Sequence, residues 1–160
     1  GDVADVPRIH DAIKYHIPEA VISINTGQRV PLKNNSPPYE DFTFGYPIQF
    51  LRHKPSDCVN YPAITSIEAT MDGYLNSEGE KSLGHIFTSL NSKWHTGTNV
   101  WSLEQAQEWM SRILIAKGAW TWGVKRAYGK LQEIIYIEDV MFLRKVYAEL
   151  NVVPPYTYQC

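Results

Sequence analysis

All five tryptophans of this 160-residue chain fall between positions 94 and 122, and basic and aromatic side chains lie among them or just after them. Tryptophan, tyrosine and arginine dominate the hot spots of protein interfaces, and indole rings also stack on sugars. The clustering predicts a recognition surface made of Trp94, His95, Trp120, Trp122, Lys125, Arg126 and Tyr128. The alternative is an aromatic core that braces the two ends of a helix, because tryptophan is usually largely buried. The two interpretations are compatible.

A short basic cluster follows the tryptophans. Lys125, Arg126 and Lys130 lie in a stretch that holds Gly123 and Gly129, which predicts an exposed loop. Such a cluster can steer an acidic partner surface toward the molecule. The alternative is a solvated turn between a helix and the next strand.

No residue spacing nominates a catalytic or metal site. The five histidines show no H-E-x-x-H spacing, and His10 and His16 are six positions apart, so they do not share a helix face. His85 alternates into a strand pattern and is expected to be a partly buried sheet residue. Cys58 follows Asp57, whose charge would raise rather than lower the thiol pKa. The sequence therefore predicts no catalytic residue, no metal and no cofactor, although scattered acids leave open a carboxylate pair.

The two cysteines, Cys58 and Cys160, predict a disulfide. Pairing them would close a loop of about 100 residues, worth up to ~4.7 kcal/mol in the chain-entropy model. Disulfides persist in oxidising compartments, so the pair predicts a periplasmic or secreted protein. The alternative is two unpaired thiols in a cytosolic protein.

Charge and hydropathy exclude several classes of partner. The chain carries 15 basic and 17 acidic residues, a net charge of −2, without a long run of either sign. A nucleic-acid or anionic membrane surface needs clustered Lys and Arg. No apolar run approaches the ~20 residues that span a bilayer. The length suits one globular domain over residues 1–160.

Hydrophobic periodicity predicts an α+β fold with a mainly antiparallel sheet and two or three helices packed on one face. Ser102 and Gln105 form a capping box at the start of the clearest helix, and Gly118 is expected to stop it. The connection over residues 72–82 and the segment 96–99 are expected to be polar loops. Helices are predicted over 6–17, 102–117 and 138–150, and strands over 20–24, 29–32, 42–51, 64–71, 83–90 and 132–137.

These features favour a non-catalytic, secreted or periplasmic binding protein. The most specific hypothesis is a bacterial inhibitor or immunity-type protein that blocks the active site of a cognate toxin or enzyme, with no nucleic acid or membrane as partner. One alternative is a small hydrolase whose site is assembled from scattered His, Asp or Glu. Another is a carbohydrate-binding module that uses Trp94, Trp120 and Trp122.

Overall fold

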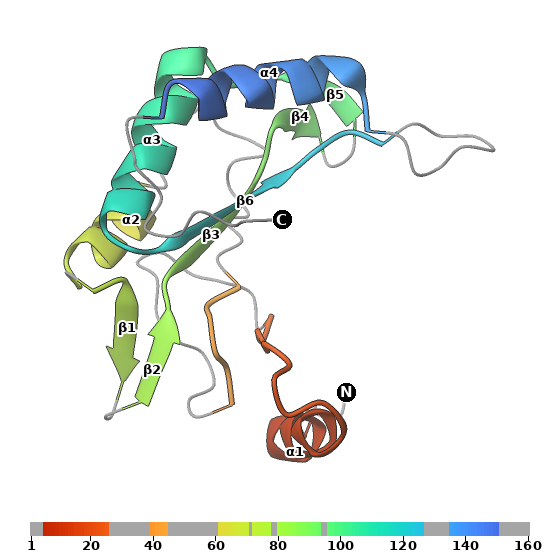
Figure 1. The fold of residues 1–160 in the computed structure, drawn as a ribbon, viewed down its shortest axis with the longest axis vertical. Helices are drawn as coiled ribbons and strands as arrows, with labels where there is room; N and C mark the ends of the chain where they lie inside the picture. The colour runs from red at the N-terminus through yellow and green to blue at the C-terminus, as the bar shows by residue number, and fades with distance from the viewer. Residues whose placement is uncertain are drawn as a thin grey trace.

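The computed structural model describes residues 5–25, 39–44, 61–70, 72–77, 80–93, 96–126 and 135–150 (Figure 1). Helices and short strands are mixed along the chain, which confirms the predicted α+β class. Their order is α1 (Val6–His16), α2 (Tyr61–Glu68), β1 (Tyr74–Ser77), β2 (Glu80–Leu83), β3 (His85–Ser89), β4 (Asn91–Lys93), β5 (Thr96–Asn99), α3 (Leu103–Ile115), β6 (Ala119–Gly123) and α4 (Ile137–Ala148).

The described strands form three pairs. β1 pairs with β2 and β4 with β5, both antiparallel, whereas β3 and β6 run parallel with α3 between them in the chain. Backbone hydrogen bonds also place residues 41–43 beside the end of β2, because Thr43 N donates to Leu83 O at 2.9 Å and Leu83 N donates to Asp41 O at 2.9 Å. The packing of the helices on one face of a sheet stays a prediction.

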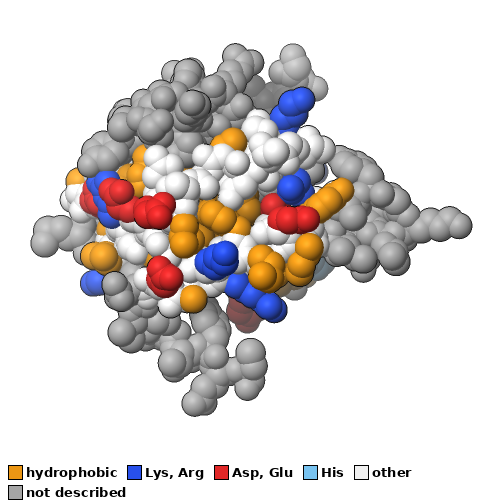
Figure 2. All heavy atoms as spheres, turned by 90° about the horizontal axis from the view of Figure 1, so that it is seen from above, with side chains coloured by type: hydrophobic (Ala, Val, Ile, Leu, Met, Phe, Trp, Pro, Cys, Tyr) orange, Lys and Arg blue, Asp and Glu red, His pale blue; other side chains and the backbone are white. Residues whose placement is uncertain are grey.

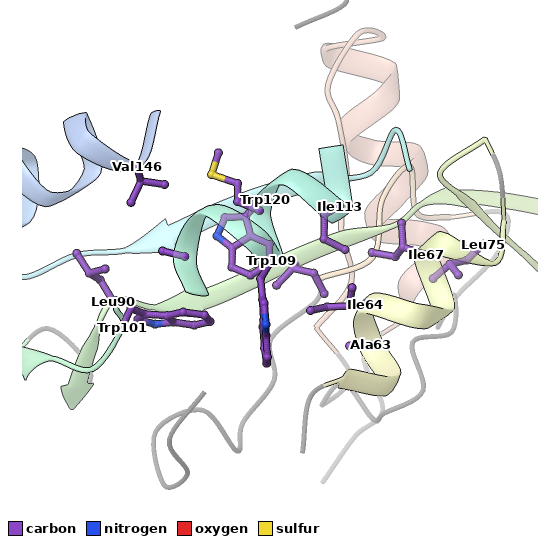
Figure 3. Close-up of a cluster of buried hydrophobic side chains, with 13 residues drawn as sticks. Ala63, Ile64, Ile67, Leu75, Leu90, Trp101, Trp109, Ile113, Trp120 and Val146 are labelled. Carbon is purple, nitrogen blue, oxygen red and sulfur yellow. The ribbon is translucent and has the colours of Figure 1, made fainter. Parts of the chain in front are cut away.

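The core lies between α2, α3 and the parallel strands (Figure 3). Ile64 and Ile67 of α2, Ile113 of α3 and Ile86 of β3 are all buried. These side chains hold the helices against the strand pair through the hydrophobic effect. A bidentate pair also links the two helices, because Arg112 Nε and Nη2 donate to the Glu68 carboxylate at 2.6 and 2.7 Å.

Side chains cap the starts of two helices. The Asp5 side chain accepts a hydrogen bond from Arg8 N at the start of α1, and Ser102 and Gln105 form the predicted capping box of α3. The residue that ends α3 differs from the prediction. Lys117, with φ of 64°, takes the left-handed conformation in place of Gly118.

The predicted strand over 64–71 is wrong, since residues 61–68 form α2. Its buried side chains, Ala63, Ile64 and Ile67, recur at helical rather than alternating spacing. Pro62 stands at the second position of the helix, where a missing N–H costs nothing. The β-branched residues of this stretch favoured a strand locally, and packing of the helical stripe outweighs that preference.

Several other expectations also need correction. The connection over 72–82 contains the β1–β2 hairpin, and 96–99 forms β5 rather than a loop. Helix α1 has no buried residue, since Ile9 and Ile17 are about half exposed, and Tyr147 of α4 is also exposed. Ile137 belongs to α4 rather than to a strand. The predicted strands over 29–32 and most of 42–51 and 132–137 lie outside the described residues.

In the part of the chain that the structure describes, none of the helices has both the length and the apolar character that crossing a bilayer requires.

Candidate functional site at the carboxyl ends of the parallel strands

The parallel strands β3 and β6 end side by side. Ser89 lies opposite Gly123 in the register, and Leu90 N donates to Gly123 O at 2.8 Å just beyond it. Helix α4 and the β4–β5 hairpin lie toward the ends to which these strands point (Figure 1). In sheets of parallel strands, ligands bind outside the carboxyl ends, so this edge is the expected location of a site.

A buried carboxylate, Asp139, organises the edge. It lies in the first turn of α4 and is 2% exposed. Its Oδ2 accepts hydrogen bonds from Asn91 Nδ2 and from Lys125 N, both at 2.8 Å. Its Oδ1 lies 3.7 Å from Lys125 Nζ. One carboxylate thus joins the segments that follow both parallel strands to the start of α4. We call Asn91, Lys125, Tyr136 and Asp139 the carboxyl-edge cluster.

Asn91 is held so that one amide atom has no partner. Its Nδ2 donates to Asp139, and its backbone N and O bond with Ser89 Oγ at 3.3 and 3.0 Å. The side chain is 1% exposed, and Oδ1 has no hydrogen-bond partner among the described residues. A buried acceptor without a donor destabilises a fold, so it marks a place where a further donor would be bound favourably.

Lys125 and Tyr136 face one another at the outer side of the cluster. Lys125 Nζ lies 5.1 Å from the centroid of the Tyr136 ring, which is within cation–π range. Tyr136 N donates to Lys125 O at 3.4 Å, and Arg126 bridges Ile135 in antiparallel fashion. The Lys125 side chain is 18% exposed and Tyr136 is 43% exposed. This pair is therefore the part of the cluster that a ligand can reach directly.

The tryptophans lie beneath this edge. The Trp101 ring packs edge-on against Trp109, Trp120 and Trp122, at centroid distances of 5.4, 6.1 and 5.2 Å. Trp101 Nε1 also donates to Ser89 O at 3.0 Å, where β3 ends. Trp109 of α3 is buried as well. The described tryptophans thus form the aromatic core that was the alternative interpretation of the cluster, and they support the strand ends from below.

The described members of the predicted recognition surface lie in different surroundings, some at the carboxyl edge and some in the aromatic core. Lys125 belongs to the carboxyl-edge cluster, and Arg126 is exposed beside it. Trp120 is only 9% exposed, and its ring is tilted by 55° from that of Trp122, so the two do not form a flat sugar-binding platform. The remaining predicted residues, Trp94, His95, Tyr128, Cys58 and Cys160, lie outside the described residues.

Sequence reasoning missed three members of the cluster. Asp139 was assigned only to a helix start, and Asn91 and Tyr136 were given no binding role. A polar residue directly after a strand pattern, as Asn91 is after residues 83–90, is the local signal that was available. The partners of Asp139 lie 48 and 14 positions away in the chain, and no local pattern indicates such contacts.

His85 lies at the opposite end of β3 and is buried, as expected of a sheet residue. Its Nδ1 lies 3.1 Å from Thr43 O and its Nε2 lies 2.9 Å from Thr121 Oγ1. Burial lowers the pKa of His85 below its ordinary value, against the opposing effect of the Thr43 and Phe44 carbonyls. The enclosed imidazole ties together adjacent segments, so we assign it a structural role.

Among the described residues, no group of three or more His, Cys, Asp or Glu side chains converges as a metal site would require.

Comparison with known proteins finds likeness in fold but not in sequence. No protein-family model matches the chain, and no curated protein sequence matches it. Among solved structures, the endo-fucoidan hydrolase P5AFcnA from glycoside hydrolase family 107 aligns over 100% of this chain and 50% of its own, with a TM-score of 0.72 and 14% identity. The endo-fucoidan hydrolases MfFcnA4 and MfFcnA9 of the same family each align over 88% of this chain, with a TM-score of 0.69 and 19% identity.

The chain spans half or less of these structures, namely 50% of P5AFcnA, 27% of MfFcnA9 and 22% of MfFcnA4. At such identities the likeness establishes the fold alone. It nevertheless contradicts the prediction of a non-catalytic inhibitor or immunity-type protein, because the described fold matches part of polysaccharide-cleaving enzymes. The prediction failed because the absence of a local catalytic motif says little about a site built from long-range contacts.

Proposed function

We propose that this chain forms part of the catalytic domain of a polysaccharide hydrolase that cleaves fucoidan or a related polymer internally. The observation that carries the proposal is the backbone match to endo-fucoidan hydrolases over 88–100% of the chain. The hydrolase alternative of the sequence analysis, with a site assembled from residues far apart in the chain, agrees with this proposal. A periplasmic or secreted location would suit a polymeric substrate, and it stays a prediction.

The position of the carboxyl-edge cluster supports the proposal. Sugars present many hydroxyl groups, and the cluster offers an ammonium group, an exposed aromatic ring and a buried amide at the edge where parallel strands end. Most glycoside hydrolases act through a pair of carboxyl groups on either side of the scissile bond. Asp139 is enclosed and already bonded to Asn91 and Lys125, so its role in this proposal is to position its neighbours.

The test is hydrolysis by the protein as its native host makes it. Purified protein is incubated with fucoidan, and new reducing ends are measured together with the size distribution of the products. Internal cleavage should lower the polymer's average mass early, while few reducing ends have formed. Heat-denatured protein and a neutral polymer, dextran, serve as controls.

A folded protein that releases no reducing ends from fucoidan, or from a panel of other algal and bacterial polysaccharides, contradicts the proposal. Release of single sugars without an early fall in mass would contradict the internal mode of cleavage and keep the hydrolase class.

A further inference from the structure

A lysine ammonium lies over a tyrosine ring and beside an aspartate at two places in the described structure. Lys81 Nζ lies 5.8 Å from the Tyr74 ring centroid and 3.4 Å from Asp72 Oδ2 on the β1–β2 hairpin. Lys125 Nζ lies 5.1 Å from the Tyr136 ring centroid and 3.7 Å from Asp139 Oδ1 at the carboxyl edge. The same three residue types therefore occur in two different surroundings.

The surroundings separate the two groups. The Asp72 side chain is 47% exposed, so the hairpin group is a solvated surface arrangement whose charges are screened. Asp139 is 2% exposed and also holds the backbone N of Lys125 at 2.8 Å. A hydrogen bond from Tyr136 N to Lys125 O fixes the two residues relative to each other. The edge group is thus pre-organised, which lowers the entropic cost of binding a ligand.

We infer that Lys125 and Tyr136 form a sugar subsite of the hydrolase, an inference that rests on the proposed function. The exposed tyrosine ring stacks against the apolar C–H face of one sugar unit. The ammonium of Lys125 donates hydrogen bonds to oxygen atoms of that unit, either hydroxyl groups or an anionic substituent. Asp139 acts as a positioning residue, because it fixes both the backbone and the ammonium of Lys125.

The unpartnered acceptor of Asn91 is a second observation that points to a ligand at this place. Asn91 is joined to Lys125 through the carboxylate of Asp139, and its Oδ1 lacks a donor among the described residues. A sugar hydroxyl is both a donor and an acceptor. It can accept from Lys125, and because Asn91 Oδ1 is enclosed, it would donate to that acceptor through an enclosed bridging water rather than directly.

The experiment measures binding of fucoidan oligosaccharides to the native protein by isothermal titration calorimetry, with dextran oligosaccharides as a neutral probe. Tyr136→Ala and Lys125→Met should each weaken binding of at least one probe by about tenfold. Tyr136→Phe, which keeps the ring, should retain most of the affinity. The matched controls, Tyr74→Ala and Lys81→Met, should bind like the wild-type protein. Circular dichroism checks that each variant is folded.

The salt dependence of binding distinguishes whether Lys125 binds hydroxyl oxygens or the oxygens of an anionic substituent. If Lys125 binds an anionic substituent, its contribution should shrink as salt is raised, whereas a contribution to hydroxyl binding should change little. The inference is overturned if Lys125→Met and Tyr136→Ala both bind as the wild type does, or if the wild type binds neither probe. Because calorimetry detects binding whether or not hydrolysis follows, loss of the subsite and failure of the proposed hydrolysis are separate results. If the protein does hydrolyse fucoidan, the two variants should raise KM more than they lower kcat.

Discussion

At the scale of single residues, Asp139 is a buried carboxylate whose burial would be unfavourable without its specific hydrogen-bond partners. A carboxylate that is 2% exposed loses most of its hydration, and hydrogen bonds from Asn91 and Lys125 replace it. The residue therefore stabilises the carboxyl edge only while both partners are present. Removing it would leave Asn91 Nδ2 and Lys125 N without acceptors.

We predict that Asp139→Ala lowers the free energy of unfolding by about 3 kcal/mol, because it breaks a buried, charged hydrogen-bond network. Urea denaturation of the variant and the wild type measures the difference. Glu138→Ala is the matched control, since Glu138 precedes Asp139 in the same turn of α4 but is exposed. It should cost less than about 1 kcal/mol, the size of a helix-dipole contribution. Equal effects of the two substitutions would contradict the network.

Whether the role of a single residue can be predicted from the sequence depends on how far away in the chain its contact partners lie. Lys125 was found because it lies in a basic cluster, which is a local property. Asp139 was recognised only as an acid in a helix's first turn, and its contact with Asn91 spans 48 positions. Local periodicity carries no information about such a pairing, because it arises only when β3 and β6 have come together.

At the scale of elements, the start of α3 was predictable because a capping box involves neighbouring residues only. Ser102 Oγ accepts from Gln105 N at 3.2 Å, and Gln105 Oε1 accepts from Ser102 N at 3.5 Å. We predict that Ser102→Ala costs roughly 0.5–2 kcal/mol in thermal or chemical unfolding. Gln105→Ala should cost less, because it removes only the longer, reciprocal bond. A change within measurement error for Ser102→Ala would show that the cap does not limit stability.

The end of α3 depends on packing that the sequence does not display. Gly118 was expected to adopt the left-handed conformation, but Lys117 takes it. Gly118 instead allows a close approach, since an added Cβ would lie 2.8 Å from Ile67 Cγ2 and 2.9 Å from Gly84 O. The same glycine thus has a tertiary role in place of the local one predicted for it.

We therefore expect Gly118→Ala to destabilise the protein by about 1–3 kcal/mol through overpacking against Ile67 and the backbone of Gly84. Lys117→Gly is the control at the adjacent position. Glycine adopts positive φ without steric cost, so that variant should be as stable as the wild type or slightly more stable. Chemical denaturation measures both, and a neutral Gly118→Ala would show that the helix end can shift to make room.

At the scale of the whole molecule, the mixed α+β class followed from the alternation of periodic segments, whereas the class of function did not. The carboxyl-edge cluster combines residues after β3, after β6 and at the start of α4. Figure 2 shows charged and hydrophobic side chains interspersed on the face seen from the α4 side. Catalytic motifs consist of residues close together in the chain, so the sequence predicted neither the cluster nor the likeness to polysaccharide hydrolases. Helix α2 is a similar case: its β-branched residues locally favour a strand, and only its packing in the folded protein makes it a helix.

Two titratable groups predict how stability of the whole fold depends on pH. Burial lowers the pKa of His85 from its ordinary 6.5, so below pH 6.5 the unfolded state binds a proton that the folded state resists. The hydrogen bond from Arg112 lowers the pKa of Glu68 from its ordinary 4.5, with the same consequence below pH 4.5. Both groups therefore contribute stability that is present at neutral pH and is lost as the pH falls.

We expect the free energy of unfolding, measured in urea from pH 8 to pH 3.5, to decline in two stages. The first stage begins near pH 6.5 and should be reduced in His85→Gln, which cannot take up a proton. The second begins near pH 4.5 and should be reduced in Glu68→Gln, which also loses the charge that Arg112 pairs with between α2 and α3. Since the Glu68 pair is partly exposed, its stage should also weaken in high salt, whereas the stage of the buried His85 should not. A profile that stays flat between pH 7 and pH 5 in the wild type would show that His85 is not held neutral in the folded protein.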